Sequence, residues 1–122
     1  MAIKKNGARV LTAPEIKVTV AGKEYVLEPT LQAVRAICSQ AEGLVPAFRG
    51  VRNVNIDVMA SVILAGSGTQ LKDSEALEDF LDAIWREPDK AALGGPLSDY
   101  IALLLAGGAP AGDDTSGETD PS

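Results

Sequence analysis

The stretch IKVTVAGKEYVLEPTLQAV, residues 16–34, decides the fold of this chain, because it describes a hairpin that runs directly into a helix. From Ile16 to Val20, apolar residues alternate with polar ones, which is the period-two pattern of a strand with one buried face. Gly22 tolerates the positive φ that a tight turn requires, and a second strand follows. We therefore predict a β-hairpin over residues 15–28.

The residues after the hairpin predict a helix. Pro29 has no N–H to donate, so it ends the second strand, and Thr30 stands where an N-cap belongs. Apolar residues then recur at helical spacing over about 31–41. Because two strands alone are marginal in water, the hairpin needs a cover. We expect Val18, Val20, Tyr25 or Leu27 to pack against Val34, Ile37, Ile63 and Leu64, on the helices at 31–41 and 56–65.

The downstream pattern predicts three more helices, at about 56–65, 74–85 and 97–106. The first is apolar nearly all round and the second is strongly amphipathic, with Asp73 or Ser74 as its cap. The third follows Gly94-Gly95-Pro96, while Leu44 to Arg49 reads as a short helical or irregular piece broken by Pro46 and Gly50. The fold class is thus α+β: a mostly α-helical small single domain over 15–106, with an N-terminal β-hairpin packed on about four helices.

The two ends of the chain differ from this body. Residues 1–14 show no sustained period, and we interpret them as a flexible arm. Residues 107–122 consist of Gly, Pro, Ala, Ser, Thr and acids. Such a composition buries too little apolar surface to offset its ordering entropy, which predicts a disordered acidic tail.

Composition excludes several kinds of chemistry. His is absent and Cys38 is the only cysteine, so no disulfide framework, zinc site or His-activated nucleophile is expected. No phosphate-binding loop is present either, because Gly66-Ser67-Gly68 follows a helix and lacks the spacing that such loops need. We predict that the protein is not an enzyme and uses no cofactor.

Charge divides the chain into two halves. Residues 1–52 carry eight Lys/Arg and four Asp/Glu, a net of +4, whereas residues 53–122 carry three and thirteen, a net of −10. The acidic half argues against nucleic acid as the main partner, and solubility is the simplest role for the charge, with head-to-tail or basic-protein association as the alternative. No signal peptide or apolar span is evident, so a cytoplasmic protein is expected.

The helix at 74–85 holds the candidate partner site. Its carboxylates, Glu75, Glu78, Asp79 and Asp82, fit a solvated polar face better than an acid/base pair, which needs a desolvated carboxyl. On the other side its apolar stripe can be core or a surface for a partner helix. We expect the only Trp to serve the core, and partial exposure would favour the partner site, which comprises Leu77, Phe80, Leu81, Ile84 and Trp85.

The opening stretch also carries a family resemblance. Its alternating β residues, glycine, Lys-x-Tyr-x-Leu at 23–27 and Pro-Thr-Leu at 29–31 resemble the N-terminal signature of the small tail-assembly chaperones of tailed bacteriophages and gene transfer agents. The likeness extends through IDVMASVILAGSG to about residue 66. The resemblance implies a protein that binds the helical tape-measure protein in the host cytoplasm, helps tail-tube subunits assemble around it, and is not part of the mature virion.

Two other functions remain open from the sequence. One is a structural head-tail or tail component, which predicts closed rings and more strand than a single hairpin. The other is a small acidic adaptor or inhibitor, which needs carboxylates clustered on one folded surface. The free sheet edge invites strand addition from another copy, which fits a chaperone that oligomerises along its client. We therefore also predict a self-association edge at Ile16, Val18, Val20, Tyr25 and Leu27.

Overall fold

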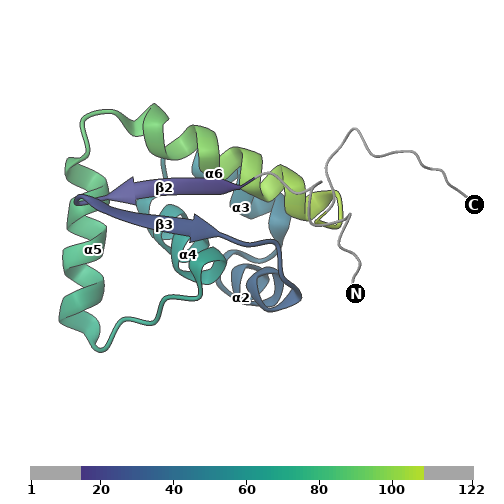
Figure 1. Cartoon of the computed structure of the whole chain (residues 1–122), viewed down its shortest axis with the longest axis horizontal. Coiled ribbons are helices and arrows are strands. Elements are labelled where there is room, and N and C mark those ends of the chain that lie inside the picture. The colour runs from purple at the N-terminus through teal and green to yellow at the C-terminus, as the bar shows by residue number, and fades with distance from the viewer. Residues whose placement is uncertain (1–14, 109–122) are drawn as a thin grey trace, which may run out of the picture.

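The computed structural model describes residues 15–108 and begins with the predicted hairpin (Figure 1). Strand β2 (Ile16–Val20) pairs antiparallel with β3 (Lys23–Leu27), and the register places Ile16 opposite Leu27. The turn between them needs left-handed backbone at both central positions, with φ of 52° at Ala21 and 81° at Gly22. Positive φ at both residues is the geometry that matches the twist of the two strands.

Five helices follow within residues 15–108, one more than the sequence predicts. They are α2 (Leu31–Ala41), α3 (Leu44–Arg52), α4 (Ile56–Ser67), α5 (Ser74–Arg86) and α6 (Lys90–Leu105). Side-chain oxygens cap four of them by accepting from backbone N–H groups of the first turn, at Thr30, Asn55, Asp73 and Asp89. The predicted class, an α+β domain with a hairpin on helices, is confirmed.

The two largest differences from the predicted boundaries concern prolines. Residues 44–52 form one continuous helix, because Pro46 lies in its first turn, where no intrahelical N–H is required. Helix α6 begins at Lys90 and continues through Pro96. Burial of Leu93 and Leu97, one turn apart on the same face, holds its first part against the core.

The chain closes with a turn after α6. Gly107 and Gly108 have φ of 81° and 87°, and the N–H of Gly108 donates to the carbonyl of Leu103 at 2.8 Å. This 6→1 bond is the usual closure of a helix C-terminus. Residues 107 and 108, which the sequence assigns to the disordered tail, therefore form an ordered turn. The rest of the predicted tail lies outside the described residues, as does the predicted arm at 1–14.

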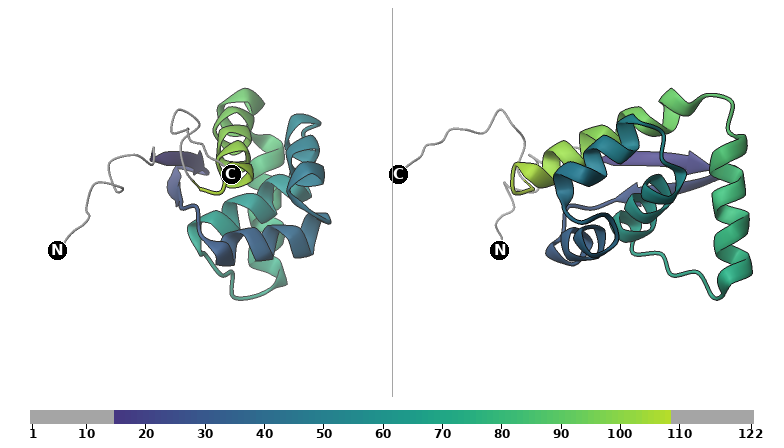
Figure 2. Two further views of the ribbon diagram at one scale, coloured as in Figure 1. Left: turned by 90° about the vertical axis from the view of Figure 1, so that its right-hand side faces the viewer. Right: turned by 180° about the vertical axis from the view of Figure 1, so that it is seen from behind.

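The hairpin is covered mainly by helices that the sequence does not place there. Strand β2 packs on α6 and α5, and β3 packs on α4, so that the strands form one side of the molecule and the helices the other (Figure 2). Helix α2 packs instead on α4 and α3. The expectation that α4 covers the hairpin is confirmed, whereas the expectation that α2 does so is wrong, because α6 arrives from the far end of the chain.

A joint between three segments fixes the end of the hairpin. The N–H of Glu28 donates to the carbonyl of Gly66 at 3.0 Å, and the hydroxyl of Tyr100 donates to the carbonyl of Glu28 at 2.6 Å. A Cβ added at Gly66 would lie only 3.0 Å from the Tyr100 ring and from Leu27. Glycine at position 66 thus lets β3, α4 and α6 meet closely.

Candidate partner-binding surface

Helix α5 divides its apolar stripe between the core and the surface. Phe80 and Ile84 are 7% and 0% exposed, and the Phe80 ring meets Tyr25 of the hairpin edge-to-face at 5.6 Å. Leu77 and Trp85 are 39% and 58% exposed, and Leu81 between them is half-buried. The expectation that the only Trp serves the core is therefore wrong. Three residues at i, i+4 and i+8 form an exposed flank of α5, which we call the α5 flank: Leu77, Leu81 and Trp85.

Neighbouring charges hold the indole in place. The guanidinium of Arg86 lies 5.1 Å from the centre of the Trp85 ring, within the range of a cation–π contact. Both oxygens of Asp82 accept from Nε of Arg86, at 3.0 and 2.8 Å. The ammonium of Lys90 donates to the backbone carbonyl of Trp85 at 2.7 Å, which satisfies one of the last carbonyls of the helix. An aromatic ring ordered in this way loses little side-chain entropy when a partner covers it.

The acidic side of α5 is solvated, as the sequence predicts. Glu75, Glu78, Asp79 and Asp82 are all exposed, and of these only Asp82 has an ion pair within the described residues. The flank is thus bordered by carboxylates that stay available to a basic partner. Such charges steer association more than they add affinity.

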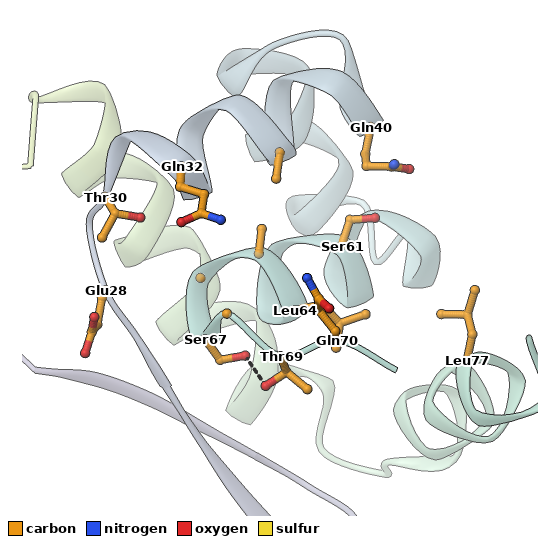
Figure 3. A pocket seen from close by; sticks show the side chains of 14 residues that line it. Glu28, Thr30, Gln32, Gln40, Ser61, Leu64, Ser67, Thr69, Gln70 and Leu77 are labelled. Carbon is orange, nitrogen blue, oxygen red and sulfur yellow. Dashed lines mark hydrogen bonds between the residues drawn. The ribbon is translucent and has the colours of Figure 1, made fainter. Parts of the chain in front are cut away.

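A groove opens beside the N-terminal end of the flank (Figure 3). It lies between α2 and α4, has a volume of about 490 Å³ and extends to Leu77 of α5. Its walls carry both polar and apolar side chains, among them Gln32, Ala36, Gln40, Ser61, Leu64 and Gln70. The Ser67 and Thr69 hydroxyls at its floor are 2.8 Å apart and hydrogen-bonded. Because Leu77 belongs to both, the groove and the α5 flank form one continuous surface.

Sequence reasoning does not find this groove. Gln32 and Gln40 read as the solvated side of an amphipathic helix, and α4 reads as apolar all round. A signal is nevertheless present, since Ser61 and the small residues Ala65 and Gly66 interrupt the large side chains of α4. Small residues on one helix leave room beside its neighbour.

The predicted self-association residues point inward. Ile16, Val18, Val20, Tyr25 and Leu27 are all between 2% and 9% exposed, so their side chains belong to the core. What the hairpin presents to solvent is the opposite face, which includes Lys17, Thr19 and Val26. Strand addition through the backbone of an unpaired edge stays a prediction, but these side chains take no direct part in it.

The most perturbed titratable group serves the fold. Burial, and next the charge of Glu28, raises the pKa of Tyr100 to about 12, so the hydroxyl stays a hydrogen-bond donor. Cys38 is half-buried on α2. Within residues 15–108, no group of three or more His, Cys, Asp or Glu side chains is placed to hold a metal ion.

None of the helices in the described part of the chain is long and apolar enough to cross a membrane. Comparison with protein-family models, with curated proteins and with solved structures found no match to this chain.

Proposed function

We propose that this protein is a non-enzymatic assembly chaperone that covers an apolar helical segment of a larger protein. By its resemblance to the tail-assembly chaperones over about residues 15–66, the client is the tape-measure protein of a tailed phage or gene transfer agent. In this role the chaperone keeps the client dispersed in the host cytoplasm while tail-tube subunits assemble around it, and it leaves before the virion is complete.

The observation that carries the proposal is the exposure of Trp85. A domain with one Trp and two Phe gains most by burying its largest side chain, yet 58% of Trp85 faces solvent. Its ring contacts Arg86, which is itself paired with Asp82. Leu81 and Leu77 precede Trp85 at one-turn intervals. Rigid exposed aromatics of this kind are the usual anchors of protein interfaces.

The shape and charge of the surface favour a helix as client. The α5 flank presents apolar residues at i, i+4 and i+8, which is the spacing that meets the stripe of an amphipathic helix. Glu78, which is exposed and lies three residues before Leu81, borders it, so the preferred client segment carries Lys or Arg beside its apolar stripe. The amide-lined groove beyond Leu77 can accept the polar residues that follow.

The alternatives find less support in this geometry. A ring-forming structural component calls for more strand than the two-stranded sheet within residues 15–108. An acidic mimic of nucleic acid would bind through its carboxylates and does not require an apolar flank around a tryptophan. The assembly chaperone accounts for both the flank and its acidic border.

Co-production with the tape-measure protein encoded in the same genome tests the proposal. We expect the tape-measure protein to stay in the soluble fraction and to co-purify with this chain, and we expect the chain to be missing from purified particles. If this protein were present in stoichiometric amount in mature virions, or if the tape-measure protein were equally soluble without it, the proposal would be wrong.

A further inference from the structure

A second exposed patch lies on α2 and adjoins the groove, with which it shares Gln32 and Ala36. Leu31 is 74% exposed, the most exposed large apolar residue in the described part of the chain. One turn later comes Arg35, which has no ion pair within residues 15–108. Together with Gln32 and Ala36 these residues line a shallow hollow. No acidic residue occupies the first turn of α2, so the positive end of its dipole adds to the charge of Arg35.

The described chain ends near the start of α2. A Cβ at Gly108 would lie 3.6 Å from Cβ of Pro29 and 3.7 Å from its carbonyl oxygen, and Pro29 comes two residues before Leu31. The end of α6 and the start of α2 accordingly lie at the same end of the molecule (Figure 1). Fourteen residues follow Gly108, with four carboxylates and no cation: APAGDDTSGETDPS.

We propose that this C-terminal segment, residues 109–122, docks on the outer face of α2 of its own chain. Pro110 covers Leu31, and the carboxylates of Asp113 and Asp114 face Arg35 and the positive end of the helix. The inference goes beyond the proposed function, because it concerns a different face from the α5 flank.

The order and spacing of residues along the two segments agree. The apolar residues at 109–111 come directly after Gly108 in the sequence, and the paired aspartates begin three residues after Pro110. Leu31 and Arg35 are about 6 Å apart along the helix axis at 1.5 Å per residue, and three extended residues span at most about 10 Å. The segment can therefore reach both without strain, and its attachment at Gly108 keeps its effective concentration high.

Backbone amide and Arg side-chain NMR spectra of the full-length chain test this docking. We expect the double variant D113N/D114N to shift the Nε–Hε resonance of Arg35 and the amides of residues 31–36, while the α5 amides stay in place. The matched double variant E118Q/D120N removes the same charge from a position closer to the end of the segment, and it should produce less than half of that shift. In the reciprocal direction, R35Q should shift the amides of residues 113 and 114, and R49Q, which alters an exposed arginine on α3, should not.

Salt and concentration identify the occupant. The shifts caused by D113N/D114N should shrink at 0.5 M NaCl, because such charges are then screened within about 4 Å, and they should not change with protein concentration. Equal shifts from the two double variants, or no shift at residues 31–36, would overturn the proposal. Shifts that vanish on dilution would also overturn it, since they would mean that the α2 face binds a second copy.

Discussion

Tyr100 shows how one side chain ties together segments far apart in the sequence. It is fully buried, yet its hydroxyl reaches the carbonyl of Glu28, seventy-two residues earlier. The local sequence around Tyr100 does not predict that bond, because a tyrosine at helical spacing resembles any other core residue. The bond places the start of α2, and with it one wall of the groove.

Replacing Tyr100 by Phe tests this bond through its pH dependence. The pKa of Tyr100 is raised from 10.0 to about 12 in the folded protein, so the unfolded chain loses its phenolic proton first as the pH rises. The native chain should therefore lose stability between about pH 10 and pH 12, in addition to whatever the lysines contribute. At pH 7 the Y100F variant should be less stable by about 1–2 kcal/mol, because the Glu28 carbonyl loses its donor.

Urea unfolding followed from pH 7 to pH 11.5 measures both effects. We expect the difference in unfolding free energy between the native chain and Y100F to narrow above pH 10. A difference that is constant over this range would mean that the hydroxyl is not held in its neutral form by the fold.

At the scale of elements, periodicity predicts those whose signals are local. The hairpin and helices α2, α4 and α5 lie within two residues of their predicted bounds, since caps and apolar spacing mark both of their ends. Helix α3 is not predicted as a regular helix, and α6 begins earlier than predicted, because Pro46, Gly94 and Pro96 are residues that usually end a helix. Tertiary burial of Val51, Leu93 and Leu97 overrides those local preferences, and a single sequence does not display it.

Replacing two of the glycines by alanine should change the stability of the protein in opposite directions. A Cβ at Gly94 meets no atom within 4 Å, so G94A should stabilise α6 by about 0.5–1 kcal/mol through helix propensity. At Gly66 a Cβ meets Leu27 and Tyr100 at 3.0 Å, and the overpacking, about 1–3 kcal/mol, should exceed the same gain. Thermal unfolding of both variants gives the comparison, and a stabilised G66A would show that the joint is looser than described.

Substitutions on the buried and on the exposed side of α5 should have different effects on stability. F80A removes a ring that packs on Tyr25 in the core and should cost about 3–5 kcal/mol. W85A should change the unfolding free energy by less than about 0.5 kcal/mol, because the side chain is mostly exposed. Urea midpoints distinguish the two variants. A large loss of stability in W85A would mean that Trp85 is part of the core, as the sequence predicts.

At the scale of the whole molecule, the least predictable features are those made by several elements together. The groove needs α2, α4 and Leu77 of α5 at once, and the hairpin cover needs α6, the last element of the chain. The stripe on α5 is readable from the sequence, but its division into buried Phe80 and exposed Trp85 depends on where the hairpin lies. The sequence therefore identifies the helix that carries the candidate surface, but it does not show which residues of the apolar stripe face the solvent.

In the proposed function, the α5 flank binds an apolar helical segment of the tape-measure protein. Titration of that protein, or of its soluble helical fragments, against the full-length chain and its W85A variant tests this most directly. A matched control is L105A, since Leu105 is 50% exposed on α6. We predict that W85A raises the Kd roughly 30-fold or more, as truncation of an interface anchor does, and that L105A leaves it within about twofold. Equal affinity of W85A and the native chain would contradict the account.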